Sequence, residues 1–251
     1  MLPGEAVEFE RFTKTERRNS RRFSILGYAM VFIAVFFIAA GEADADSGAV
    51  IQADGVSLMA AMISDNNLEI VSRLINAGVV DVNATLEGGI TMLMHAAMVT
   101  DNPEIVAALL TAGADVNAVS QDGFTALMYA LGGDSREIIT MLIAARADVN
   151  AMSQDGFTVL MGAVFLSDCP EVITELLAAG ADIDATASNG YTALMVAALH
   201  DVNPDVIITL LDAGADARIR NNVGETALDI ARDNTYLANS EAFRRLYEAS
   251  F

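Results

Sequence analysis

Apolar residues in this 251-residue chain fall into short runs that occur in pairs, separated by polar stretches that contain glycine. Leu127, Met128 and Leu131 mark one such run, and the apolar positions of residues 138–142 mark the next. Spacings of three and four residues place side chains on one face of a helix. The pattern therefore predicts pairs of short helices over residues 53–251, and one pair alone is too small to bury its own apolar faces.

Nearly the same eleven residues occur twice, as SQDGFTALMYA from residue 120 and as SQDGFTVLMGA from residue 153. These copies belong to a longer series with an interval of 33–35 residues. The leucine that recurs in the series stands at Leu58, Leu93, Leu127, Leu160, Leu194 and Leu228. A regular interval of this length is typical of proteins built from stacked repeats.

Certain residues recur at fixed points of each unit and indicate where its helices begin and end. A Gly-x-Thr sequence such as Gly123–Thr125 precedes the first helix, where the threonine can cap the helix N-terminus. Asn or Ser caps, often followed by proline as in DNPE at 101–104, precede the second helix. A glycine with a left-handed backbone is expected after the second helix, at Gly78, Gly113, Gly180 and Gly214. Arg146 replaces this glycine in one unit, where we expect backbone strain.

A unit that has Gly-x-Thr-x-Leu early and a stretch such as LLTAGADVNA (109–118) late resembles the ankyrin repeat. The family usually has Thr-Pro-Leu-His, whereas this chain has TALM or a close variant, without the Pro and the His. The resemblance implies an all-α solenoid of about six helix–turn–helix units with β-hairpin-like connecting loops. The expected repeats are residues 53–86, 87–119, 120–152, 153–186, 187–219 and 220–251.

Residues 1–45 follow a different pattern. A basic region at 1–22 precedes an uncharged apolar run at 23–40, which predicts an N-terminal apolar helix, and small residues follow at 41–45. This order is typical of a secretory signal peptide, but the run also approaches the length of a membrane anchor, and both interpretations stay open. With residues 46–52 as a linker, the repeat domain at 53–251 is expected outside the cytoplasm. It would be periplasmic or secreted, or anchored to the membrane only through its N-terminal segment.

The charge of the chain narrows the class of partner. Residues 23–251 contain 30 Asp or Glu, eight Arg and no Lys, a net charge of −22. An acidic body repels phosphate backbones, so a nucleic-acid partner is not expected. The same charge can attract a basic surface of another protein.

The sequence shows no constellation for catalysis, a cofactor or a metal, so we expect none of the three. His95 and His200 are the only histidines, and neither lies in a zinc, phosphate-loop or nucleophile motif. A pocket joining one of them with a nucleophile and a carboxylate would indicate an enzyme instead. Cys169 has no disulfide partner within the chain and is expected to be inert.

Methionine also recurs at the repeat interval, at Met59, Met94, Met128, Met161 and Met195. Filling of the core is the expected role of these side chains. The alternative is an envelope stress protein whose methionines absorb oxidant or metal.

Two repeat positions supply candidate partner-binding residues. The residue after the repeat glycine is Ile90, Phe124, Phe157 or Tyr191, and we place Val223 at the end of this row. The resemblance places His95, Tyr129 and Val196 on the concave side of the solenoid. Aromatic residues anchor many interfaces, although packing of hairpin against helix explains the first row equally well.

The sequence therefore predicts a monomeric, non-enzymatic scaffold that is exported and binds another protein. The expected contacts are the concave groove and the hairpin tips, and the partner is expected to present a basic surface. A membrane-anchored subunit of an envelope complex is the alternative.

Overall fold

The computed structural model describes residues 60, 63–78, 80–133, 135–166, 170–200, 203–238 and 240–251. The chain divides into two units, Met1–Gln52 and Ala53–Phe251, and every described residue belongs to the second. The predicted N-terminal apolar helix and signal sequence, together with Leu58, Met59 and Cys169, lie outside the described residues. No helix in the described part of the chain has the length and apolar character needed to cross a bilayer.

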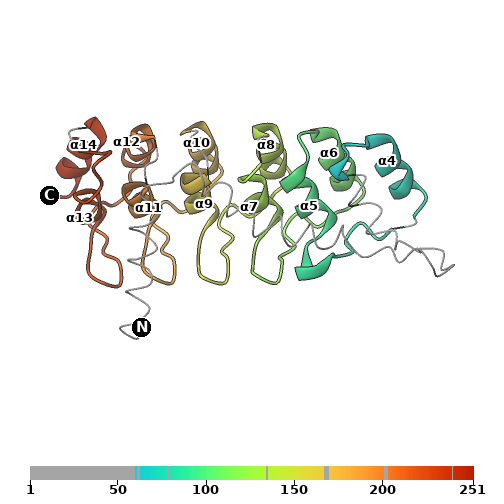
Figure 1. Ribbon diagram of the computed structural model, residues 1–251, viewed down its shortest axis with the longest axis horizontal. Coiled ribbons are helices and arrows are strands. Elements are labelled where there is room, and N and C mark those ends of the chain that lie inside the picture. Colours follow the sequence, from blue (N-terminus) through green and yellow to red (C-terminus); the bar gives the residue numbers. More distant parts are fainter. Residues whose placement is uncertain are drawn as a thin grey trace, which may run out of the picture. The chain divides into compact units, whose positions relative to one another are not determined.

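The described residues of the second unit form a row of helix pairs (Figure 1). The first helices of successive pairs are α5 (Met92–Val99), α7 (Ala126–Ala130), α9 (Val159–Leu166), α11 (Ala193–Leu199) and α13 (Ala227–Ala231). The second helices are α4 (Leu68–Asn76), α6 (Pro103–Thr111), α8 (Arg136–Ala144), α10 (Pro170–Ala178), α12 (Pro204–Asp212) and α14 (Glu241–Ala249). A 3-10 turn, η1 (Glu87–Gly89), precedes α5. The predicted all-α solenoid of helix–turn–helix units is confirmed.

Threonine caps begin the first helices, as the sequence predicts. The Thr91 hydroxyl accepts a hydrogen bond from the backbone N–H of Met94 at 3.2 Å, and Thr158 accepts one from Met161 at the same distance. Equivalent bonds occur at Thr125, Thr192 and Thr226. Because each cap satisfies an N–H that the helix leaves free, these short helices begin at a defined residue.

The caps of the second helices agree with the prediction in part. The Asn102 side chain accepts from the backbone N–H of Glu104 at 3.0 Å, and Asn203 caps α12 in the same way. Ser135 makes no side-chain cap hydrogen bond, so the serine cap predicted for α8 is wrong. This helix begins at Arg136, whereas α6, α10 and α12 begin with proline.

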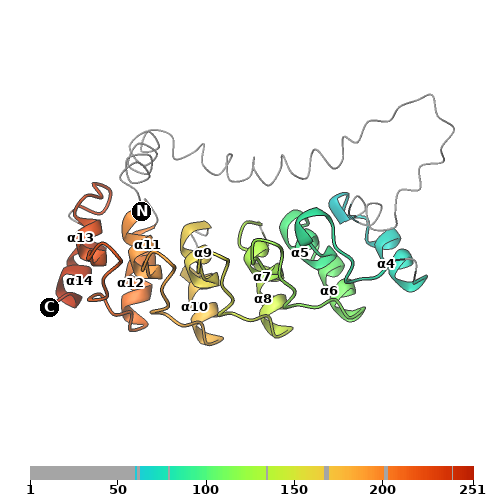
Figure 2. The same cartoon turned by 90° about the horizontal axis from the view of Figure 1, so that it is seen from below.

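The helices pack as two rows, because each first helix contacts the first helices of its neighbours and each second helix contacts the second helices (Figure 2). The leucine of the repeat series is buried at Leu93, Leu127, Leu160, Leu194 and Leu228. Met94, Met128, Met161 and Met195 are buried beside these leucines and are at most 7% exposed. The predicted core role of the described methionines is confirmed, and the apolar faces are covered by neighbouring units.

Candidate protein-binding surface

Hairpin-like loops connect successive units and lie at residues 84–91, 118–125, 151–158, 185–192 and 219–226; together they are called the hairpin row (Figure 1). In each loop one backbone N–H donates to the carbonyl of the residue that follows the repeat glycine, as in Ser120 to Phe124 at 2.9 Å. Asn221 donates to Glu225 in the last loop. Glu225 therefore ends the row, and the placement of Val223 there was wrong because Val223 precedes the glycine.

Backbone hydrogen bonds also join each hairpin to the next one. The N–H of Gln121 donates to the carbonyl of Gly88 at 2.8 Å, and the N–H of Gln154 donates to the carbonyl of Asp122 at 3.1 Å. Ser188 and Asn222 continue the series. These bonds hold the hairpins at a fixed separation, so the hairpin row is a preformed surface.

Glycine is required where neighbouring hairpins approach each other. Gly123 has a φ of 81°, and a Cβ at this position would lie 2.9 Å from the backbone nitrogen of Gln154. Gly190 has a φ of 80°, and its Cβ would lie 2.8 Å from the backbone nitrogen of Asn222. Both the left-handed backbone and the close contact exclude a side chain.

The aspartates of the repeat have a structural role between the hairpins and the second helices. Asp115 accepts a hydrogen bond from the backbone N–H of Asn117 at 2.9 Å and so closes a turn. The Asn117 side chain donates to the Arg146 carbonyl at 3.2 Å and accepts from the Asp148 N–H at 2.7 Å. The Asp-x-Asn sequence therefore links one unit to the next, which accounts for part of the acidic composition.

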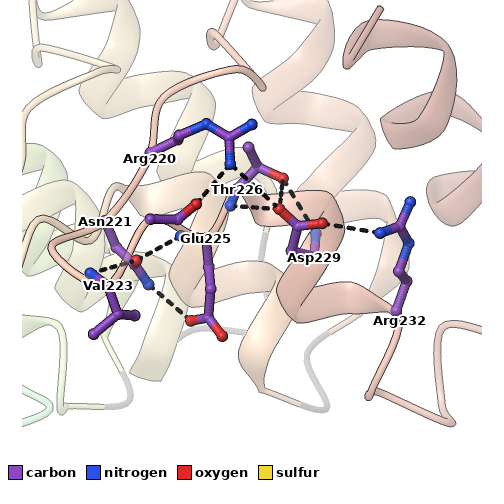
Figure 3. A network of polar contacts seen from close by, with 8 residues as sticks. Arg220, Asn221, Val223, Glu225, Thr226, Asp229 and Arg232 are labelled. Carbon is purple, nitrogen blue, oxygen red and sulfur yellow. Dashed lines mark hydrogen bonds and ion pairs between the residues drawn. The ribbon is translucent and has the colours of Figure 1, made fainter.

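The N-terminus of α13, the first helix of the last unit, is capped differently. Asp229 stands there where the inner units have methionine. Figure 3 shows its carboxylate accepting from the Thr226 N–H at 3.1 Å and hydroxyl at 2.9 Å. Arg232 lies 2.9 Å and Arg220 3.8 Å from the same carboxylate. The hydrogen bonds from Thr226 and the two guanidinium groups hold the pKa of Asp229 below its usual range.

The predicted contact residues differ in how much surface they present. Ile90, Phe124, Tyr129, Phe157 and Tyr191 are half-buried and pack against the core. The structure brings two of them together, since the rings of Phe124 and Tyr129 lie 5.8 Å apart. His95 is only 2% exposed and Val196 only 4%, so these two side chains offer almost no surface to a partner. The prediction that these two side chains present surface on the concave side is therefore wrong, because both are buried within the repeat domain.

Burial raises the pKa of both tyrosines. The Asp122 carboxylate raises the pKa of Tyr129 further, and the hydrogen bond with Ser120 opposes these effects. Glu225 raises the pKa of Tyr191, while the hydrogen bond with Asn221 opposes it. Both phenols therefore stay neutral near neutral pH and remain able to donate a hydrogen bond to a partner.

His95 contacts a potential nucleophile but lacks the rest of a catalytic site among the described residues. Its Nε2 lies 3.0 Å from the Ser64 hydroxyl oxygen and 3.2 Å from the Ala60 carbonyl. Its Nδ1 is buried without a hydrogen-bond partner, so no carboxylate orients the ring. Burial lowers the pKa of His95, against the effect of the Ala60 carbonyl. No group of three side chains suited to a metal ion occurs in the described ranges.

Two further exposed apolar features were not predicted from the sequence. Val119 and Met152 occupy the same position in neighbouring hairpins and are 61% and 55% exposed. Phe165 is 45% exposed at the end of α9, where its ring packs edge-on against His200 at 4.7 Å. The sequence does contain a signal for Val119 and Met152. The equivalent hairpin position is polar in other units, as at Thr85, so two apolar residues there could have been recognised as unusual.

Family models of ankyrin repeats match most of the chain. The model described as ankyrin repeats in three copies matches residues 34–120, 57–153 and 93–187, and the model with many copies matches residues 176–231. The chain belongs to the ankyrin-repeat family. Ankyrin repeats are typically non-enzymatic modules of protein–protein interaction, and the fold is therefore a protein-binding one.

A solved structure contains a chain that is similar to this ankyrin-repeat chain in sequence and in fold. It is that of the predatory endopeptidase Bd0816 from Bdellovibrio bacteriovorus in complex with the immunity protein Bd3460. A chain of that structure is 30% identical, with a TM-score of 0.66, over 76% of this chain and 96% of that chain. No curated protein matches the ankyrin-repeat chain.

Proposed function

We propose that this protein binds another protein through the concave side of its repeat domain and the hairpin row, as a monomer and without catalysing a reaction. The observation that carries the proposal is the set of backbone hydrogen bonds between hairpins, because a preformed surface loses little conformational entropy on binding. Phe124, Phe157 and Tyr191 supply half-exposed aromatic surface along the same row.

The similarity to a chain of an endopeptidase–immunity protein complex supports an enzyme, and in particular a peptidase, as one class of partner. Binding of an enzyme by a rigid acidic surface would restrain that enzyme and not modify it. The oxidant-absorbing alternative receives less support, because Met94 and Met161 are 0% exposed.

Export is part of the proposal. The basic region at 1–22, followed by the uncharged apolar run at 23–40, supports transfer of the repeat domain across a membrane. Cleavage after this region would release a periplasmic or secreted protein. Retention of the region would instead make a membrane-anchored subunit of an envelope complex.

Site-specific photo-crosslinking in intact cells tests the proposal. A benzophenone amino acid is placed at Gln121 or Ser188, which are exposed hairpin positions, and at Glu104 on α6 as the matched control. We expect the same protein adduct from both hairpin positions and none from Glu104. The same adducts from all three positions, or no protein adduct, would contradict binding through the hairpin row. N-terminal sequencing of the same sample reports whether residues 1–45 have been removed.

A further inference from the structure

Val119 and Met152 form an apolar pair on the outside of two neighbouring hairpins. They are 61% and 55% exposed, while the equivalent residues of the other hairpins are Thr85, Thr186 and Arg220. Exposed apolar surface is unfavourable in water by roughly 25 cal/mol per Å². The folded domain gains nothing from this exposure, whereas a complex that covers both side chains would gain from it.

A single short segment can reach both residues. The bond from the Gln154 N–H to the Asp122 carbonyl joins these two hairpins. Packed helices lie about 8–10 Å apart, and equivalent residues of neighbouring units are separated by a similar distance. Residues i and i+2 of an extended chain project from the same face about 7 Å apart, and their side chains extend this reach. An extended segment can therefore place one side chain on Val119 and another on Met152.

The hairpin turns beside the pair carry negative charge. Glu87, Asp122 and Asp155 are exposed at the turns of three successive hairpins. Between Arg73 and Arg218 the only Arg or Lys residues are Arg136, on α8, and Arg146, just after α8. Arg136 lies 3.7 Å from Glu175 of α10, away from the hairpin turns. Cationic side chains of a partner would be attracted to these three turns.

The hairpin at 219–226 differs, because it carries Arg220 and follows directly after Arg218. Arg220 donates to the Gly224 carbonyl at 2.6 Å and faces Asp229, as Figure 3 shows. Arg218 pairs with Asp216 at 2.9 Å and Arg220 lies 3.8 Å from Asp229, so the carboxylates here are already compensated and attract a basic segment less. The hairpin at 185–192 carries no charged residue. The acidic turns without a nearby arginine in the same hairpin are therefore those of residues 84–91, 118–125 and 151–158, and the apolar pair lies in the last two.

We propose that Val119 and Met152, with Glu87, Asp122 and Asp155, form a docking site for a short extended segment of the partner that combines apolar side chains with Lys or Arg. This inference rests on the proposed function and deepens it, since it assigns the chemistry of the partner and the half of the row that it contacts. The apolar pair supplies burial, and the carboxylates select a cationic segment and set its position.

Selection from a displayed library of random short peptides on the full-length protein tests the inference. We expect the selected peptides to carry net positive charge and aliphatic or aromatic residues. We expect their affinity to fall about tenfold with Val119→Ser/Met152→Ser and with Asp122→Asn/Asp155→Asn. The control pair Glu104→Gln/Glu137→Gln removes the same charge from the second helices and should leave the affinity within about twofold.

Selected peptides without net positive charge, affinities unchanged in both hairpin variants, or an absence of binders would each overturn the inference. Circular dichroism and melting of each variant show whether a loss of affinity reflects unfolding. The crosslinks at Gln121 and Ser188 test the proposed function separately. If those crosslinks form and the library fails, the hairpin row binds a protein of different surface chemistry and only the docking site is wrong.

Discussion

At the scale of the residue, Arg146 replaces the glycine of the other units but keeps the same left-handed backbone conformation. Its φ is 72°, in the left-handed region that Gly113, Gly180 and Gly214 occupy in the other units. A Cβ at these three glycines would meet nothing within 4 Å, so the only penalty for a side chain is backbone strain. The strain of a side chain at this φ is about 1 kcal/mol relative to glycine.

Arg146→Gly should therefore stabilise the protein by about 1 kcal/mol, since it removes strain and leaves the Arg146 carbonyl free to accept from Asn117. Urea unfolding followed by circular dichroism measures the change. The matched control is Gly180→Ala, which should destabilise by a similar amount because Gly180 has a φ of 96° and free space around it. A lowered unfolding midpoint for Arg146→Gly would show that the side chain makes a stabilising contact.

Burial at single positions was the property that the sequence predicted least well. His95, Tyr129 and Val196 share one repeat position, yet only Tyr129 is half-exposed. Their periodicity is the same, but the residues that stack above them differ. The Ala60 carbonyl and the Ser64 hydroxyl from the preceding unit cover His95. Periodicity assigns a side chain to a face of its helix, and the neighbouring unit decides whether that face is open.

At the scale of the element, the hairpins and helix ends follow local rules that the sequence displays. Gly-x-Thr predicted the caps of the first helices, and the described bonds from Thr91 and Thr158 confirm them. Ser135 is the exception, because its side chain makes no cap bond to α8. Backbone hydrogen bonds between hairpins were not predictable, since they depend on the separation of units that only the stacked helices establish.

Some repeat glycines are required only for their left-handed backbone, and others also because a neighbouring hairpin lies close. Substitution by alanine distinguishes these two kinds. Gly123 and Gly113 have φ values of 81° and 91°, so alanine introduces similar strain at both. Only at Gly123 would the new Cβ also meet a neighbouring hairpin, at 2.9 Å from the Gln154 nitrogen. We expect Gly113→Ala to destabilise by about 1 kcal/mol and Gly123→Ala by a further 1–3 kcal/mol or so. Urea midpoints measure both, and equal losses would show that hairpin contact contributes little to stability.

At the scale of the whole molecule, the charge balance opposes compaction. Residues 23–251 carry 30 acidic groups and eight arginines, and the ion pairs of the described residues lie mostly at the surface. Exposed pairs of this kind contribute about 0–1 kcal/mol each. Repulsion among the remaining carboxylates is therefore only weakly compensated, and it decreases with ionic strength.

Raising the salt concentration from about 10 mM to about 150 mM shortens the Debye length from roughly 30 Å to 8 Å. We expect the melting temperature to rise by a few degrees, about 2–4 °C for each kcal/mol of relieved repulsion. Thermal melts in sodium chloride and in choline chloride measure the change, and equal rises would separate screening from specific binding of sodium. A melting temperature that falls with salt would show that attractive ion pairs dominate.

The sequence by itself determined the repeat interval, the threonine caps and the left-handed residues after the second helices. These features depend on hydrogen bonds and backbone angles within a few residues, so a linear pattern contains them. Only the tertiary structure decided that His95 and Val196 are covered and that Val119 and Met152 are exposed. The physical reason is that exposure and hairpin pairing depend on the adjacent unit, whose contacting residues lie about one repeat away in the chain.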